Sequence, residues 1–280
     1  ALAGGEMMDW LLFGIFIFLM LTGVPLAVAM GLAGVVVVAV ADLGMMSLPT
    51  NVYTGIAKYP LMAIPVFVIA GLIFEKAGVA ATIVRFASAL VGQRRGSLAI
   101  VAILVAMILG GISGSGPADS AAVGAVMLPS MLKAGYPRSF TAGVIAAAGS
   151  TDILIPPSIA FVIYSLLVPQ ASVPALFAAG MIPGILSGLT LILVAWWLSV
   201  RNNFEAEPAE ARPPFWQSLK EAGWGLLAPV IILGGMRSGF FTPTEAAVVA
   251  VVYGLLVGMV IYRTLTWKEV YQVLVESAEI

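Results

Sequence analysis

The chain has 280 residues, of which 61% are hydrophobic and 10% are charged, and its formal net charge is −1. Soluble domains carry about 25% charged residues, so this composition indicates a membrane protein that crosses the bilayer several times. The near-zero net charge argues against the basic surface of a nucleic-acid-binding protein. Cysteine and histidine are absent, which removes disulfides, thiolate chemistry and the commonest general base and metal ligand. We therefore do not expect an enzyme such as an intramembrane metalloprotease or a His-dependent hydrolase.

The first apolar run, residues 7–41, lacks a basic leading region and is too long for the core of a signal peptide. We interpret it as a membrane anchor, broken at residues 22–25 into two helices or one long kinked helix. Residues 1–6 resemble a tag remnant or the end of a linker from a fused upstream subunit. A polar connection is expected over residues 42–59, followed by an apolar helix over residues 60–74.

Charged residues are spaced among apolar ones in residues 75–95. This pattern predicts an amphipathic helix that lies at the membrane interface instead of spanning it.

Residues 97–135 hold two apolar halves separated by a glycine- and serine-rich break at residues 110–120. Each half is short for a full span, which needs about 20 residues. Basic residues, which favour the cytoplasmic side, flank both ends: Arg94, Arg95, Lys133 and Arg138. Entry and exit on one side predict a re-entrant hairpin with its tip at mid-membrane.

Residues 139–168 are predicted to cross the membrane once, as a helix broken at residues 149–158. Residues 168–174 would form an outer loop, and residues 175–200 would return inward to Arg201. Most Lys and Arg then lie inside, although Lys58, Lys76 and Arg237 have no clear side.

The remaining sequence completes four predicted regions. Residues 201–222 are polar and read as a cytoplasmic linker, helices follow at residues 224–236 and 243–262, and residues 263–280 form an amphipathic segment at the inner surface. The predicted regions are an N-terminal part with an amphipathic arm helix (1–96), the hairpin, broken helix and return helix (97–200), the linker (201–222) and further membrane helices (223–280).

The break at residues 110–120 contains Ser113, Gly114, Ser115 and Gly116. Glycine lets the backbone turn sharply and expose carbonyls, and hydroxyl and carbonyl oxygens are ligands for a hard cation. Small residues also serve close helix packing in membranes. Because Pro117 and Asp119 adjoin the break, we favour an ion or substrate site.

Asp119 and Asp152 fall at predicted membrane depth. An aspartate at the bilayer centre costs roughly 2.5 to 3.5 kcal/mol, so it usually faces a cavity, a partner or an ion. For Asp119, capping of the second half-helix and a cation role are equally supported. For Asp152 we favour an ion or a polar network.

Pro156-Pro157-Ser158 breaks the next helix and leaves carbonyls of the preceding turn unpaired. These carbonyls suit a sodium ion, although a simple kink is the alternative, and Ser158 can cap a helix, contact substrate or do both. Glu245 sits in the first turn of a helix that Thr242 or Thr244 would cap, which is a structural role. Five tryptophans flank apolar runs and are interpreted as interfacial anchors: Trp10, Trp196, Trp197, Trp216 and Trp224.

Several motifs, in order along nearly the whole chain, resemble the large membrane subunit of tripartite ATP-independent periplasmic (TRAP) transporters. They are Ala63-Ile64-Pro65-Val66-Phe67, Gly111-Ile112-Ser113-Gly114-Ser115, Ala118-Asp119, Met127-Leu128-Pro129-Ser130-Met131, Gly135-Tyr136, Ile153-Leu154-Ile155-Pro156-Pro157-Ser158 and Phe241-Thr242-Pro243-Thr244-Glu245-Ala246. The resemblance implies an all-α polytopic membrane protein with a re-entrant hairpin and a discontinuous helix, forming one half of an inverted-repeat elevator-type transporter.

The resemblance also implies sodium-coupled import of an organic acid, such as a C4-dicarboxylate or sialic acid, in the bacterial inner membrane. The implied partners are a periplasmic substrate-binding protein, a small membrane subunit that is separate or fused, and membrane lipid, with sodium as the coupling ion and no other cofactor. The implied sodium ligands lie in Ser113, Gly114, Ser115, Ser150, Thr151, Asp152, Ile153 and Pro156. The implied substrate contacts are Ser115, Asp119, Pro157 and Ser158.

The sequence departs from the family pattern in two places. Asp152 stands where many members have glycine, and no second copy of the hairpin and broken helix is found before Ile280. We therefore expect the N-terminal part of the subunit, unable to complete a transport cycle alone. A standalone ion-coupled carrier and a non-transporting membrane scaffold are the alternative functions.

Overall fold

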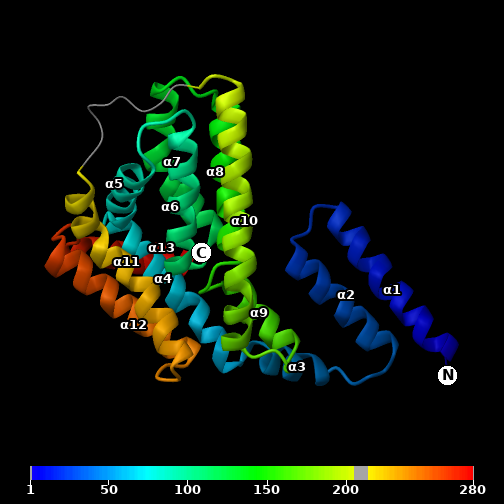
Figure 1. The fold of residues 1–280 in the computed structure, drawn as a ribbon. Coiled ribbons are helices and arrows are strands. Elements are labelled where there is room, and N and C mark those ends of the chain that lie inside the picture. Colours follow the sequence, from blue (N-terminus) through cyan, green and yellow to red (C-terminus); the bar gives the residue numbers. More distant parts are fainter. Residues whose placement is uncertain (1, 205–213, 280) are drawn as a thin grey trace. The chain divides into compact units, whose positions relative to one another are not determined.

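The computed structural model describes residues 2–204 and 214–279, and the regular structure in these ranges is helical (Figure 1). The chain forms two compact units, Ala1–Lys58 and Tyr59–Ile280. Residue 1 of the expected tag or linker remnant and residues 205–213 of the expected cytoplasmic linker lie outside the described residues.

The first unit contains α1 (Leu2–Leu21), α2 (Leu26–Val40) and α3 (Ser47–Ile56). Of the two alternatives for the first apolar run, the structure has two separate helices, because Gly23 adopts a positive φ of 85° and Pro25 precedes α2. The small side chains of Ala29 and Ala33 are buried where α2 packs on α1. The prediction of a polar connection over residues 42–59 was incomplete, since α3 occupies its centre.

The second unit begins with a short 3₁₀ turn, η1 (Tyr59–Met62), which leads into α4 (Ala63–Lys76). The amphipathic helix expected at residues 75–95 is α5 (Val79–Val91), which is shorter because Gly78 and Gly92 adopt positive φ on either side of it. The apolar face of α5 is buried against α6 and α11.

The expected hairpin is α6 (Ser97–Ser113) followed by α7 (Gly116–Lys133). The expected broken helix is α8 (Arg138–Asp152) followed by α9 (Ile159–Leu167), and the return helix is α10 (Val173–Arg201). At 1.5 Å per residue, α6 is about 26 Å long and α10 about 44 Å, so the hairpin turns back partway along α10 (Figure 1). The re-entrant position of this hairpin in a bilayer stays a prediction.

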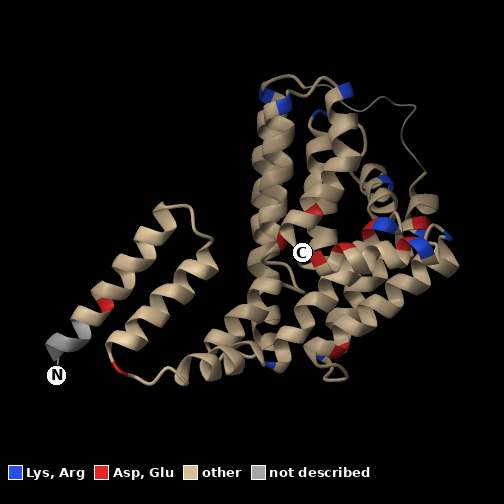
Figure 2. Cartoon of the chain, turned by 180° about the vertical axis from the view of Figure 1, so that it is seen from behind, with Lys and Arg blue, Asp and Glu red and all other residues tan. Residues whose placement is uncertain are grey.

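Basic residues gather where α6 and α8 begin and where α7 and α10 end (Figure 2). Contacts join the loops at this end: Arg95 donates to the Asn203 side chain at 2.8 Å. Phe204 packs on the rings of Tyr136 and Phe140, with ring centres 5.1 and 5.0 Å away. This arrangement matches the predicted positive side of the unit.

The unit ends with α11 (Phe215–Arg237), α12 (Pro243–Leu255), a π-helical stretch (Leu256–Ile261) and α13 (Trp267–Glu279). The structural role predicted for Glu245 is confirmed, because Thr242 and Glu245 form a reciprocal capping box at the start of α12. The same pair of contacts joins Thr266 and Glu269 at the start of α13, where the hydrogen bonds from Thr266 lower the pKa of Glu269.

Four helices of the second unit are long and apolar enough to span a membrane: Tyr59–Lys76, Val173–Arg201, Phe215–Arg237 and Pro243–Ile261. Met7–Leu21 of α1 and the helices α2, α5 and α6 are shorter apolar segments. The tryptophans expected to anchor the chain at the interface are exposed, from 44% at Trp224 to 79% at Trp216. The chain is therefore a multi-pass membrane protein.

Two apolar clusters hold the second unit together. The larger surrounds α6, whose buried side chains on all sides make it the central helix, and includes Ile83, Ile103 and Met127. The other joins α4, α9, α10, α11 and α12 through residues such as Phe67 and Ile232. The predicted site residues of the hairpin tip lie at the end of α6.

Candidate functional site

The tip of the hairpin is a two-residue turn between α6 and α7. Gly114 adopts the left-handed conformation, with φ of 64°, and Ser115 is extended before α7 starts at Gly116. The break is narrower than the predicted residues 110–120, because the flanking glycines and serines remain helical. Only the position with positive φ requires glycine for its backbone conformation.

The second break separates α8 from α9 over residues 153–158. Ser158 caps α9 by accepting from the Phe161 N–H at 3.4 Å, and its hydroxyl donates to the Ile153 carbonyl at 2.6 Å. The Pro156–Pro157 peptide is cis. The predicted capping role of Ser158 is confirmed, and the predicted break is present in its C-terminal part, whereas Gly149 to Asp152 remain helical.

The structure brings these two breaks into contact. A Cβ added at Gly114 would overlap the Pro157 carbonyl, and one at Gly116 would overlap the Gly149 carbonyl. A Cβ at Gly110 would lie 2.9 Å from the Cα of Asp152. The missing side chains at these glycines therefore allow the hairpin tip to pack directly on the backbone of α8 and of the break.

Asp119 is 4% exposed and lies in the first turn of α7. Its carboxylate accepts from the Ser113 hydroxyl at 2.6 Å, and the same hydroxyl oxygen accepts from the Ser115 N–H at 3.1 Å. The alternative in which Asp119 caps the second half-helix is wrong, because Ser115 occupies the N-cap position. The negative charge is instead favoured by the positive end of the α7 dipole, and the Asp119–Ser113 bond holds the tip closed.

Asp152 is fully buried at the C-terminal end of α8. Thr151 Oγ1 lies 3.4 Å from its Oδ1, but its Oδ2 has no hydrogen-bond partner among the described residues. Neither described ion pair, Lys76–Glu276 or Arg85–Glu221, involves Asp152 or Asp119. A buried carboxylate oxygen without a donor is costly, so this atom is the part of the site most in need of a cation or proton.

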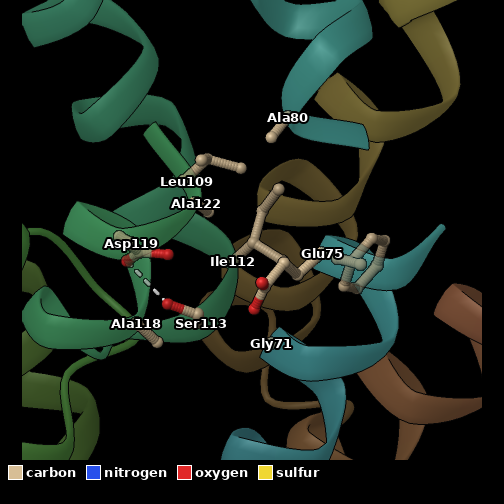
Figure 3. Close-up of a pocket in the computed structure, with 10 residues that line it drawn as sticks. Gly71, Glu75, Ala80, Leu109, Ile112, Ser113, Ala118, Asp119 and Ala122 are labelled. Atoms are coloured by element: carbon tan, nitrogen blue, oxygen red, sulfur yellow. Dashed lines mark hydrogen bonds between the residues drawn. The ribbon is translucent and has the colours of Figure 1, made fainter. Parts of the chain in front are cut away.

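A small pocket beside the hairpin tip is lined from four helices, α4 to α7 (Figure 3). Ser113 and Asp119 form one part of its wall, and the Glu75 carboxylate points toward that side of the pocket. Glu75 was not among the site residues predicted from the sequence. It follows Gly71 by four residues, and residues four apart share one face of a helix. Because Gly71 contacts Ser113, Glu75 lies on the face of α4 that is turned toward the hairpin tip.

α10 supports the second break from behind through glycines spaced by four residues. A Cβ at Gly180 would lie 2.7 Å from the Leu154 carbonyl oxygen, and one at Gly184 would lie 2.8 Å from Ile155 Cγ1. These glycines were also missed as supporting residues. Their small-xxx-small spacing, which is typical of close membrane-helix packing, could have indicated them.

The other predicted site residues are placed differently. Ser150 is exposed and lines a groove against α10 together with Ser187 and Thr190, so the structure does not bring it to the hairpin tip. Its hydroxyl donates to the Ala147 carbonyl, as that of Thr151 does to Ala148, each at 2.7 Å. Pro156 and Pro157 are buried in the break, whereas the Ile153 side chain is 42% exposed.

The oxygen atoms available at the two breaks indicate which class of cation could bind there. Within residues 2–204 and 214–279, no group of three or more Asp, Glu, His or Cys side chains is arranged to hold a metal ion. The oxygens at the two breaks are instead hydroxyls, backbone carbonyls and the Asp119 and Asp152 carboxylates. Such a donor set suits a hard monovalent cation better than a transition metal.

Comparisons with known proteins all find members of one family. A family model described as "Tripartite ATP-independent periplasmic transporter, DctM component" matches residues 13–280. The chain is 38% identical over 273 residues to the isethionate TRAP transporter permease protein DctMQ of Oleidesulfovibrio alaskensis, covering 95% of this chain and 42% of the relative. It is 35% identical over 282 residues to the C4-dicarboxylate TRAP transporter large permease protein DctM of Rhodobacter capsulatus, covering 96% and 64%.

A third relative, the sialic acid TRAP transporter large permease protein SiaM of Vibrio cholerae, is 40% identical over 223 residues, or 80% of this chain and 52% of the relative. The chain thus spans about half the length of the curated relatives it matches. The relatives are named permeases, in agreement with the expectation that the chain is not an enzyme. The family match and these identities confirm the resemblance seen in the motifs: the chain belongs to the DctM component family, the large membrane subunit of tripartite ATP-independent periplasmic transporters.

Proposed function

We propose that this chain is part of a secondary transporter that imports a small organic acid across the bacterial inner membrane and couples this import to sodium. The observation that carries the proposal is the contact between the hairpin tip and the break between α8 and α9. Non-helical backbone at membrane depth is tolerated where it is buried or lines a polar cavity. Transporters place their ion and substrate sites at such broken helices.

The proposed sodium site uses oxygens from both breaks. Ser113 to Ser115 supply hydroxyl and carbonyl oxygens at the tip, and α8 ends at Asp152 with the negative end of its dipole. The Asp152 carboxylate, whose Oδ2 has no hydrogen-bond partner among the described residues, would add one negative charge when ionised. A bound sodium ion would offset that charge, which is one way an aspartate can be tolerated at this depth.

The proposed substrate site lies at the N-termini of α7 and α9, which start at Gly116 and Ile159 next to the two breaks. Helix N-termini attract carboxylates and similar anions through free N–H groups and the helix dipole. Ser115, Asp119, Pro157 and Ser158 are the proposed contacts. The names of the relatives include isethionate, C4-dicarboxylate and sialic acid, which support a small organic acid as the substrate class.

The proposed partners follow from the three-part organisation in the family name. A periplasmic substrate-binding protein would deliver the substrate, and a small membrane subunit would complete the membrane part. One relative carries the joint name DctMQ, which supports a small subunit that is fused in some members and separate in others.

The proposed transport movement is of the elevator type. The proposed moving group is α6, α7, α8 and α10, and the proposed fixed group is α4, α11 and α12. Buried side chains of α6, α7 and α8 belong to the larger apolar cluster alone, whereas α4, α10 and α11 contribute to both clusters. The first group would move as one body against the second and carry the bound ion and substrate across the membrane. Contact of the hairpin tip with Asp152 and Pro157 supports this division, although α4 and α5 complete the pocket beside the tip.

Uptake into proteoliposomes by the full-length protein, with its small subunit and binding protein, tests the proposal. Radiolabelled organic acids would be offered with an inward sodium gradient or with potassium in place of sodium. We expect uptake that requires both sodium and the binding protein. Uptake without the binding protein would favour a standalone carrier, and sodium-independent uptake would contradict the proposed coupling. A folded, correctly inserted complex that takes up none of the acids would favour the scaffold alternative.

A further inference from the structure

Arg237 is one of the basic residues that the proposed site and the predicted membrane sides leave unexplained. It is exposed at the end of α11 and forms no ion pair with any of the described residues. The start of α10 lies beside it, whereas α10 ends at Arg201 in the basic cluster of the other end. The length of α10 places Arg237 roughly 40 Å from that cluster along the helix, at the opposite side of the membrane.

Arg237 lies at a cleft between the first turns of α10 and the last turns of α11. The cleft has a volume of about 290 Å³ and is lined by apolar side chains that include Ala178, Met181, Leu233 and Met236. Both helices are long and apolar enough to span the membrane, and the cleft lies at one end of each. The guanidinium of Arg237 is the single charged group in its lining.

The apolar lining and the single cation of this cleft favour one class of ligand. An apolar wall with one cation at its end matches an amphiphile with a hydrocarbon chain and an anionic group. A dicarboxylate, a sugar acid or inorganic phosphate would leave most of its polar atoms facing apolar side chains, which is costly. The N-terminal end of α10, capped by Ser172, adds partial positive charge on the same side as Arg237.

We propose that the cleft between α10 and α11 binds an anionic phospholipid, with its phosphate on Arg237 and an acyl chain against Ala178, Met181 and Leu233. The bound lipid would bridge α10, which packs on the hairpin, and α11, which packs on α5 and α12. The inference concerns lipid binding and does not depend on the proposed transport function.

Native mass spectrometry of the full-length protein, released from nanodiscs that contain phosphatidylglycerol and phosphatidylethanolamine, tests this site. For Arg237→Gln we expect an about fivefold fall in bound phosphatidylglycerol, the effect of one basic residue near an anionic lipid, with phosphatidylethanolamine unchanged. Arg237→Lys should retain the enrichment, which separates loss of charge from misfolding. Ala178→Trp, which fills the cleft from an exposed position, should reduce binding of both lipids.

Lys133→Gln is the matched control, because Lys133 is an exposed basic residue at the opposite end of the bundle and lies outside the cleft. Unchanged phosphatidylglycerol binding in Arg237→Gln would overturn the proposal, and so would an equal fall in Lys133→Gln. A photo-crosslinking amino acid at position 178 gives an independent result. A lipid adduct supports the site, whereas an adduct with protein would show that a protein segment covers the cleft.

Discussion

The two buried aspartates of the site differ in how their oxygens are bonded. Asp119 is held by the Ser113 hydroxyl and lies at the positive end of α7, so its charge has protein partners. Asp152 lies at the negative end of α8 and keeps one oxygen without a donor among the described residues. These bonds support a role of Asp119 in the shape of the tip and the proposed role of Asp152 at a cation site.

Asp152→Asn keeps the shape of this side chain and removes its charge. If Asp152 offsets the charge of sodium, the sodium concentration for half-maximal uptake should rise about tenfold, which corresponds to about 1.4 kcal/mol of lost binding. Where uptake is too weak to titrate, the rise in melting temperature with added sodium measures the same loss. The exposed Glu279→Gln serves as the control. An unchanged sodium dependence in Asp152→Asn would remove Asp152 from the site.

Ser113→Ala removes the donor to Asp119 and leaves a buried carboxylate without a hydrogen bond from the protein. We expect the free energy of unfolding, measured without sodium, to fall by about 1–3 kcal/mol. In Ser165→Ala the lost bond is one to the Val162 carbonyl within the same helix, so the change should stay within about 0.5 kcal/mol. Equal losses in the two variants would show that the Ser113–Asp119 bond does not stabilise the tip.

At the scale of helices, contact between the two breaks depends on positions without side chains. Gly110, Gly114 and Gly116 bring the hairpin against α8 and the second break, and Gly180 and Gly184 bring α10 against the same break. The glycines of the hairpin, which suggest an ion site in the sequence, and those of α10, which are spaced for close helix packing, therefore belong to one arrangement. Close packing and a cation site are not alternatives here, because the packing positions the oxygens.

Gly114→Ala tests this arrangement where it is most constrained. Alanine costs about 1–2 kcal/mol in the left-handed conformation, and its Cβ would also overlap the Pro157 carbonyl. We expect lower thermal stability together with loss of sodium-dependent uptake. Gly143→Ala, in α8 with open space around it, should be neutral or up to about 1 kcal/mol more stable. Normal uptake and stability in Gly114→Ala would contradict the proposed contact.

The breaks could be predicted from sequence because glycine and proline act locally on the backbone. The extent of the breaks could not be predicted. Gly110 to Ser113 and Gly149 to Asp152 remain helical, and the two segments contact each other across the bundle at Gly110 and Asp152. α3 was missed because its ten residues contain few apolar ones and a proline near their start. Glu75 was missed because its approach to Ser113 depends on how α4 packs, which no local pattern specifies.

At the scale of the second unit, the proposed elevator movement divides the helices where α6 meets α11. Gly111, next to the hairpin tip, faces Pro229 in α11, and a Cβ at Gly111 would lie 3.4 Å from the Pro229 Cβ. Disulfides have Cβ atoms about 3.5–4.5 Å apart, so a cysteine pair at these positions can join the two groups of helices. A second pair can be placed between α11, in the group proposed to stay fixed, and α5, which packs on α11 and is taken to stay with it. A Cβ at Gly225 of α11 would lie 3.8 Å from the Cβ of Val79 in α5.

The final prediction compares these two cysteine pairs in the full-length protein, after replacement of any cysteine outside these 280 residues, which contain none. Oxidation of the Gly111→Cys, Pro229→Cys pair should stop uptake, and reduction should restore it, because the disulfide would tie the moving helices to the frame. Oxidation of the Val79→Cys, Gly225→Cys pair should leave uptake unchanged. Sodium-driven uptake by a fully oxidised Gly111–Pro229 variant would show that α6 and α11 do not separate during transport, and the division of helices proposed for the elevator would then be wrong.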